Sequence, residues 1–249
     1  MDREVTEQLI EEASEIAPLV KEGLDEVLGR VETAATSAGR DPGSISVVVV
    51  TKGRPPVVAL AAWLAGAKIL GENRADELAT KATLLEPAFG HSDVPPPKWH
   101  FIGHLQRNKA RHVIGIATVI HSLDSSDLAR ELIKRSAGAE IEPPACLVEV
   151  NVAREAQKYG VNPGELAEFI GDLPLRPSGL MCMAPKGAGF EEARRVFAEL
   201  AMLGHDMSER FPSLDLASLS MGMTDDFEAA IAEGATILRI GRAIFRHLR

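Results

Sequence analysis

The stretch Ser46-Val47-Val48-Val49-Val50-Thr51-Lys52 decides how this chain folds. It stands between two turn-forming pairs, Gly43-Ser44 and Gly53-Arg54. An unbroken run of β-branched valines is typical of a strand covered on both faces, as in a buried parallel sheet. A lysine at the carboxyl end of that strand would lie with its stem against an apolar wall. Desolvation there favours the uncharged amine, which can attack a carbonyl. From this stretch alone, a lysine that only reaches solvent after a core strand is the commoner case.

The strand pattern recurs along the chain and alternates with helical segments. Strands are expected near 46–51, 67–70, 98–102, 117–121, 145–151, 177–182, 215–220 and 236–240. Helices are expected at 56–65, 73–85, 105–114, 125–137, 163–171, 190–210, 225–233 and in a closing stretch from 242. Alternation of this kind indicates a parallel sheet. Eight units in 249 residues match a (β/α)8 TIM barrel, and the absence of a Gly-rich dinucleotide loop favours the barrel over an open doubly wound sheet.

The amino-terminal part precedes this alternation and has a helical spacing of apolar residues. Pro18 and Gly23 interrupt the spacing, which predicts a short helix leading into a longer one. We therefore expect a single domain over residues 1–249, with an N-terminal helical segment at 1–43 and the barrel at 46–249. The stretch Glu86–Lys98, with three consecutive prolines, predicts a surface excursion before the third strand.

Composition excludes several classes of function. A formal net charge of −9 argues against a nucleic-acid surface, which needs clustered positive charge. No apolar run is long enough for a membrane span, and the first residues lack the pattern of a signal peptide, so we expect a cytoplasmic protein. Cys146 and Cys182 both lie in apolar runs and are interpreted as buried small hydrophobes.

Chemistry in such barrels lies at the carboxyl ends of the strands, where a phosphate often binds after strands seven and eight. The seventh loop begins with Ser220, but its helix starts beside Asp225 and Asp226, whose charges would repel a phosphate. The eighth loop opens the closing segment without an acid. We therefore expect an anion at Gly241–Arg242 with Ser220 beside it. The alternatives are a plain turn at Gly241 and a salt bridge inside the barrel for Arg239.

Other motifs point to no metal site and no catalytic site. His100 and His104 fall on a strand and its end, so they are not a helical zinc pair. The sequence has no HExxH, paired CxxC, GxSxG, Walker loop or GxGxxG. We expect no metal ligands, and we interpret Tyr159 as a surface residue.

A lysine on the first strand that faces a phosphate site after strands seven and eight is the layout of pyridoxal-phosphate barrels of the alanine-racemase type. More specifically, the chain resembles the YggS/PROSC family, the pyridoxal phosphate homeostasis proteins. The matching segments run in order through almost the whole chain: Val48–Lys52, Gly71-Glu72-Asn73, Trp99–Gly103 with Leu105-Gln106 and Asn108-Lys109, His121–Asp124, Gly179–Met181, Leu219–Asp226, and Arg239–Gly241 with Ala243–Phe245.

The resemblance implies pyridoxal 5′-phosphate (PLP) held as an internal aldimine, a Schiff base, on Lys52. It implies that Ser220 and the turn at Gly241 hold the phosphate, that Arg239 faces the pyridine nitrogen, and that Asn73 contacts the substituents of the ring. An arginine beside that nitrogen keeps it unprotonated, which limits carbanion chemistry.

Three positions depart from the family pattern. His104 stands where a proline or another small or polar residue is usual, and Arg107 replaces a smaller residue. Arg242 follows Arg239-Ile240-Gly241 where a threonine, a serine or a similar small residue is usual. Arg242 either replaces that hydroxyl with a charge-assisted bond to the phosphate or turns outward and leaves the backbone amides to bind it.

The function expected from the resemblance is a non-catalytic PLP-binding protein of intracellular PLP homeostasis, which stores the cofactor or delivers it to PLP-dependent apoenzymes. A PLP-dependent amino-acid racemase or lyase is the alternative. The chain is too short for the second domain of the racemases, and a monomer is therefore expected. A cofactor-free lysine aldolase ranks below both, because Glu72 is the only carboxylate close to Lys52 on the rim.

Overall fold

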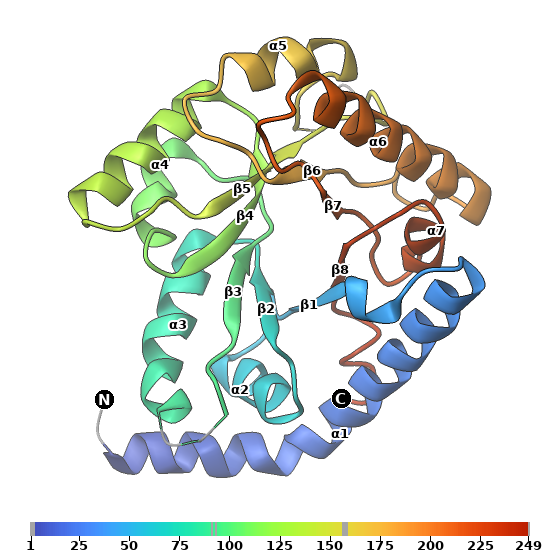
Figure 1. Cartoon of the computed structure of the whole chain (residues 1–249). Coiled ribbons are helices and arrows are strands. Elements are labelled where there is room, and N and C mark those ends of the chain that lie inside the picture. Colours follow the sequence, from blue (N-terminus) through green and yellow to red (C-terminus); the bar gives the residue numbers. More distant parts are fainter. Residues whose placement is uncertain (1–2, 91, 93, 156–158, 249) are drawn as a thin grey trace.

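The computed structural model of the chain describes residues 3–90, 92, 94–155 and 159–248. Eight parallel strands pair in sequence order, and β1 pairs with β8 to close the barrel (Figure 1). The strands are β1 (Ser46–Val50), β2 (Ile69–Glu72), β3 (Lys98–Phe101), β4 (Ala117–Leu123), β5 (Ala145–Glu149), β6 (Gly179–Met181), β7 (Ser218–Ser220) and β8 (Ile237–Ile240). The predicted (β/α)8 barrel is confirmed, and the open sheet is excluded.

Helices surround the barrel (Figure 1). The α-helices are α1 (Arg3–Ser37), α2 (Pro56–Leu64), α3 (Ala75–Phe89), α4 (Ser126–Gly138), α5 (Leu166–Gly171), α6 (Phe190–Arg210) and α7 (Phe227–Ala232), and the 3-10 helices are η1 (Pro42–Ser44), η2 (Arg107–His112) and η3 (Pro163–Glu165). Across the part of the chain described, none of the helices has the length and apolar character needed to cross a membrane.

Three of the expected helices differ from the structure. The helix expected at 105–114 is only η2, although Leu105, Ala110 and Val113 of this stretch are buried in the core. The closing stretch from 242 forms turns, with the Phe245 amide donating to the Gly241 carbonyl oxygen at 3.2 Å, since so short a segment cannot offset helix nucleation. Conversely, α3 continues through Pro87 to Phe89, which shortens the expected surface excursion.

The predicted break in the amino-terminal helix is wrong, because α1 runs from Arg3 to Ser37 with Pro18 inside it. The helix changes direction along its length, as expected where a proline removes a hydrogen bond (Figure 1). Gly23 does not end the helix either. A Cβ atom at this position would lie 2.1 Å from the carbonyl oxygen of Ile244. Gly23 therefore allows α1 to pack directly against the carboxyl-terminal turns.

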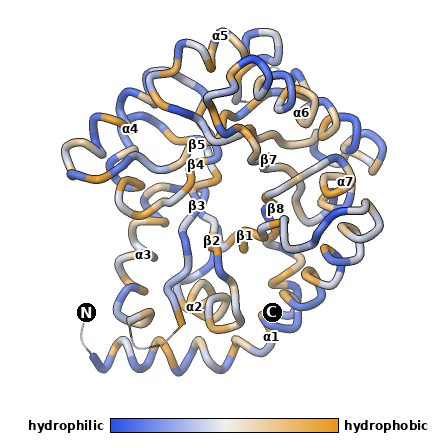
Figure 2. The backbone as a smooth tube through the Cα atoms, viewed as in Figure 1, coloured by the Kyte–Doolittle hydropathy of each residue, from blue (hydrophilic) through white to orange (hydrophobic). Residues whose placement is uncertain are grey.

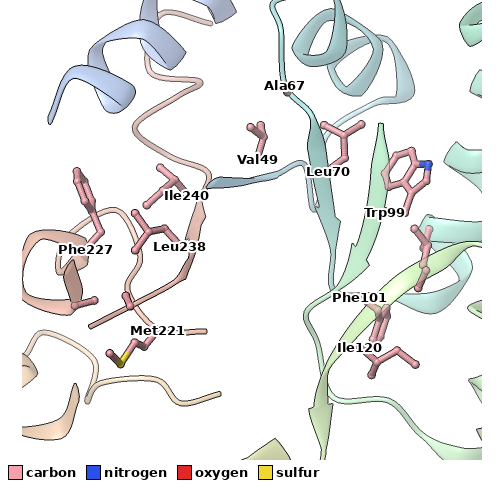
Figure 3. Packing of buried hydrophobic residues seen from close by; sticks show 14 of the residues in the cluster. Val49, Ala67, Leu70, Trp99, Phe101, Ile120, Met221, Phe227, Leu238 and Ile240 are labelled. Carbon is pink, nitrogen blue, oxygen red and sulfur yellow. The ribbon is translucent and has the colours of Figure 1, made fainter. Parts of the chain in front are cut away.

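The apolar core lies between the barrel and its helices. Val49, Leu70, Leu238 and Ile240 are all buried on the outer face of the sheet, where they belong to one cluster with residues from the helices (Figure 3). Hydrophilic and hydrophobic residues alternate along α1, which buries one face (Figure 2). Since strand residues alternate in direction, their neighbours along each strand point to the barrel axis.

The close approach at Gly23 predicts opposite effects for two glycines of the same helix. Gly23→Ala should lower the free energy of unfolding by about 1–3 kcal/mol, because the methyl group would overlap the Ile244 backbone. Gly29→Ala is the matched control, with nothing within 4 Å of its Cβ position, and should raise stability by about 0.5–1 kcal/mol through helix propensity. Urea denaturation measures both. Equal effects of the two substitutions would contradict the packing described.

Candidate functional site

Two of the predicted site residues meet inside the barrel. Ser220, at the end of β7, is fully buried, and Arg239 on β8 is 5% exposed. The guanidinium of Arg239 donates from Nη1 to Ser220 Oγ at 2.5 Å and from Nη2 to the carbonyl oxygen of Cys182 at 2.9 Å. The salt bridge considered for Arg239 is thus replaced by hydrogen bonds to neutral acceptors, with the carboxylates of Glu149 and Asp226 near enough to act on its charge.

Two histidines that were not assigned to the site extend this pair across the barrel. His121 on β4 makes a hydrogen bond from Nδ1 to Ser220 Oγ at 2.8 Å. Its Nε2 makes another, at 2.9 Å, to Nδ1 of His100 on β3. Strands β4 and β7 are not neighbours in the closed barrel, so these side chains can meet only through its interior. The sequence did contain a signal, because each histidine directly follows a large apolar residue within a strand, Trp99 in β3 and Ile120 in β4.

Burial controls the charges of this interior. It lowers the pKa of His100 to about 4, with a further contribution from the positive charge of Lys98. It lowers the pKa of His121 well below its usual value, and His100 and Arg239 act in the same direction. Burial also lowers the pKa of Arg239, and the negative charges of Glu149 and Asp226 oppose this shift. Both imidazoles are therefore neutral near pH 7, beside a guanidinium that stays charged.

Lys52 follows β1 and is exposed, so the desolvation expected for this lysine is not found. Within the described part of the chain, Lys52 makes no hydrogen bond or ion pair. The loops after β1 and β8 are in contact. A Cβ atom at Gly241 would lie 3.1 Å from the Val50 carbonyl oxygen, and Arg54 stacks over the ring of Phe245 at 4.3 Å. These contacts bring the backbone that carries Lys52 next to the Gly241 turn.

The loops after β7 and β8 also meet, but not in the way the sequence suggested. Arg242 is exposed and its guanidinium bonds to the carboxylate of Asp225, so of the two roles considered for Arg242 the structure adopts the outward one. The Ala243 amide faces Thr224 Oγ1 at 3.5 Å. The expectation of a helix amino end at Gly241–Arg242 is wrong, because turns follow. An anion here would depend on loop amides and on Ser220.

A buried ion pair supports the backbone beside Lys52. Lys81 on α3 is 4% exposed and Glu72 at the end of β2 is fully buried. Lys81 Nζ donates to Glu72 Oε1 at 2.5 Å and to the Thr51 carbonyl oxygen at 2.8 Å, while the Thr51 hydroxyl donates to the same Glu72 oxygen at 2.6 Å. The pKa of Glu72 is raised above its usual value, because the effect of burial exceeds the opposing effect of the hydrogen bonds from Lys81 and Thr51. Thr51, which immediately precedes Lys52, is therefore anchored through both its backbone and its side chain.

The remaining rim residues have partners of their own or stand apart. Asn73 is half-buried, and its carbonyl oxygen lies against Gly103. Nδ1 of His104 lies 3.2 Å from a carboxylate oxygen of Asp124, and its ring stacks on Tyr159 at 3.7 Å between ring centroids. Arg107 lies 3.8 Å from a carboxylate oxygen of Asp127. Tyr159 is 58% exposed, in line with its interpretation as a surface residue.

Two other features lie away from the barrel axis. A groove of about 760 Å³ separates parts of α1 and α7, and the charged side chains that line it are paired with one another, Arg30 with Glu228 and Arg246 with Glu26. Among the described residues, Glu22, Glu26 and His247 bring ligand atoms within 4.8 Å of one another. The bond from Arg246 to Glu26 competes with any cation there. The barrel interior is therefore the candidate site.

Comparison with known proteins places the chain in a family. It is 39% identical over 228 residues to the pyridoxal phosphate homeostasis protein of Aquifex aeolicus, covering 90% of this chain and 96% of that one. It is 38% identical over 231 residues to the protein of the same name from Pseudomonas aeruginosa, covering 91% and 94%. The chain belongs to the pyridoxal phosphate homeostasis protein family. The resemblance found in the sequence is thereby confirmed, although no family model matches the chain.

Solved structures agree with this membership. A crystal structure of an unknown protein from Bifidobacterium adolescentis matches with a TM-score of 0.83 at 34% identity, over 92% of this chain and 95% of that one. PipY of Synechococcus elongatus with PLP bound matches with a TM-score of 0.73 at 31% identity, over 86% and 99%. An alanine racemase from Bartonella henselae, at 11% identity and a TM-score of 0.63, shares the barrel fold alone.

The buried ion pair predicts a large effect of removing one partner. Lys81→Met should lower the free energy of unfolding by about 3–5 kcal/mol, because the Glu72 carboxylate would stay buried without its cation. The double variant Lys81→Met, Glu72→Gln should recover most of that loss. Lys109→Met is the matched control, since its ion pair with Asp76 is solvent-exposed and should contribute little to stability. Equal losses for the Lys81 and Lys109 variants in urea denaturation would refute the role of the buried pair.

The lowered pKa of His100 predicts a loss of stability in acid. In the unfolded chain this histidine takes up its proton near pH 6.5, but in the folded protein only near pH 4. As the pH falls from 6.5 to about 4, the unfolded state therefore binds more protons and stability declines, by up to about 3 kcal/mol from this residue. Urea midpoints measured across this range should fall less steeply for His100→Gln than for the natural protein. Parallel slopes would show that His100 titrates normally in the fold.

Proposed function

We propose that this chain binds PLP at the mouth of the barrel and serves intracellular PLP homeostasis by storing or delivering the cofactor. The observation that carries the proposal is the buried Arg239–Ser220 pair, which lies inside the same barrel end that presents the free amine of Lys52. PLP is a phosphorylated aldehyde with a pyridine ring. The hydroxyl can bind its phosphate, the cation can donate to its ring nitrogen, and the amine can react with its aldehyde. The family membership and the PLP-bound PipY structure support the same ligand.

The residues present fit this cofactor. Arg239 has more N–H donors than its two hydrogen bonds use, and Ser220 Oγ can donate one hydrogen to a phosphate oxygen. The Gly241 turn packs so closely on β1 that a side chain there would crowd the Val50 backbone. We assign Lys52 as the covalent tether, Ser220 and Gly241 to the phosphate, Arg239 to the pyridine nitrogen, and Asn73 to the ring substituents. Arg242 is left out of the phosphate contacts because its exposed guanidinium is paired with Asp225.

The same residues support binding rather than turnover. When bound, PLP supplies an aldehyde that condenses with amines and a ring that can accept electrons. A guanidinium at the ring nitrogen donates a hydrogen bond without giving up its proton, so the ring is a weak electron sink. Lys52 is the one amine that we assign to the site as a base. A racemase needs a second base on the opposite face, and Tyr159 is stacked against His104 instead.

An amino-acid racemase or lyase remains the second candidate, since the unpaired amine of Lys52 could act as a base.

We also propose that the protein acts in the cytoplasm as a monomer and hands PLP to apoenzymes. In this proposal the barrel and the N-terminal helix form one unit. The continuous packing of α1 on α2 and α7 supports the single unit.

Lys52→Ala tests the proposal directly. Purified protein mixed with PLP should turn yellow, and borohydride should bleach the band and fix a cofactor-sized mass on the peptide that contains Lys52. The alanine variant should form no adduct, because it lacks the amine, whereas Lys68→Ala, which removes an exposed lysine, should behave like the natural protein. Mass spectrometry of the peptides measures the outcome. An adduct elsewhere, or no colour at all, would overturn the assignment. Racemisation of amino acids at ordinary enzymatic rates would favour the second candidate.

A further inference from the structure

Four side chains form an unbroken line of hydrogen bonds through the barrel. His100 Nδ1 lies 2.9 Å from His121 Nε2, His121 Nδ1 lies 2.8 Å from Ser220 Oγ, and Ser220 Oγ accepts from Arg239 at 2.5 Å. All four side chains are 5% exposed or less. The line starts on β3, passes β4 and β7, and ends on β8. It therefore connects the phosphate anchor that we propose to the opposite side of the barrel.

The positions of the hydrogens in this line are restricted. Arg239 can only donate, so Ser220 accepts from it. Each neutral imidazole carries one ring hydrogen, and the contact between the two rings needs one donor and one acceptor. Two arrangements satisfy these conditions. In the first, Ser220 donates to His121 Nδ1, and His121 donates from Nε2 to His100. In the second, His100 donates from Nδ1 to His121 Nε2, and His121 donates from Nδ1 to Ser220.

The two arrangements leave Ser220 in different states. In the first, the hydroxyl hydrogen points to His121 and cannot reach a ligand. In the second, Ser220 accepts from both Arg239 and His121, and its hydrogen is free for an acceptor. Without a ligand, the second arrangement leaves a buried donor unpaired, which disfavours it. A bound phosphate oxygen accepts that hydrogen and reverses the preference.

We propose that His121 is a positioning residue for anion binding, and that it changes tautomer when a phosphate occupies Ser220. His121 Nδ1–H aims the Ser220 hydrogen at the phosphate, and His100 fixes the tautomer of His121. In the reversal Ser220 passes its hydrogen to His121 Nδ1 and His121 passes its Nε2 hydrogen to His100 Nδ1, while water supplies a new hydrogen to Ser220 Oγ and takes up the one that His100 loses from Nε2. Each side chain keeps its number of hydrogens, and occupancy at Ser220 is transmitted to His100 without any backbone movement. This inference rests on the proposed function, in that it takes the phosphate of PLP as the ligand.

The decisive experiment observes the ring nitrogens. In the full chain labelled with ¹⁵N-histidine, nitrogen chemical shifts distinguish a ring N–H from a bare ring nitrogen, and His121→Asn and His100→Gln assign the signals. Without ligand, His121 Nδ1 should be bare. With PLP bound it should carry the hydrogen, and His100 should change from the Nε2–H to the Nδ1–H form. Unchanged tautomers in the PLP-bound protein would overturn the proposal.

Two controls separate the phosphate from the aldehyde. Pyridoxal can react with Lys52 but has no phosphate, so it should leave both histidines as in the free protein. In Ser220→Ala the link to His121 is removed, and PLP at saturating concentration should leave the tautomers unchanged. A reversal produced by pyridoxal, or retained in Ser220→Ala, would also contradict the proposal.

Affinity provides a second readout. His121→Leu removes the donor to Ser220, and its preference for PLP over pyridoxal should fall about tenfold, the effect of one hydrogen bond. His121→Asn places an amide N–H near the position of Nδ1 and should retain most of the preference. Equal preferences in the natural protein and His121→Leu would count against a positioning role.

Failure of the proposed function can be told apart from failure of this inference. If no PLP adduct forms, inorganic phosphate replaces PLP in the nitrogen measurement. A tautomer change with phosphate would then support the anchor while the PLP function fails. No change with either ligand would overturn both, and a PLP adduct without a tautomer change would overturn this inference alone.

Discussion

The hydrogen bond from Arg239 to Ser220 is the constraint on which the barrel interior depends. A guanidinium keeps its charge in a protein interior, so every neighbour must accept a hydrogen bond or carry a compensating charge. Ser220 and the Cys182 carbonyl oxygen accept, and the charges of Glu149 and Asp226 compensate. A second cation next to this group would be strongly unfavourable. His121 therefore stays neutral, and a neutral imidazole can take either direction in a hydrogen-bonded line.

This interior differs from that of most barrels of the class, which branched aliphatic side chains fill in layers. Here the apolar residues of the strands are concentrated on the outer face, against the helices, as Val49 and Leu238 illustrate (Figure 3). The inner face carries histidine, serine and arginine beside the buried valines Val48 and Val50. Such an interior stabilises the fold less than a packed apolar one, because each polar group needs a partner. In the function that we propose, these polar groups hold donors in place for a polar ligand before that ligand arrives.

Much of the fold could be predicted because its evidence is local. The valine run of β1 and the recurring turns located all eight strands to within a few residues. Errors arose where tertiary packing overrides local preference. Pro18 and Gly23 indicated a break in α1, yet burial against α2 and the Ile244 backbone keeps the helix continuous. The segment after Gly241 has helical residues but too little length to form a helix on its own.

The sequence by itself predicted the barrel and the strand ends that carry Lys52 and Ser220, since periodicity can locate them, whereas the family and the role expected for Arg239 followed from the resemblance of several segments. Only the tertiary structure decided how these residues are connected. The line from His100 through His121 to Ser220 joins strands that are far apart in the chain, and no spacing rule relates them. The pairing of Arg242 with Asp225 and the support of Thr51 by Lys81 likewise depend on loop and helix packing. Contacts of this kind are set by barrel closure, which local sequence patterns do not contain.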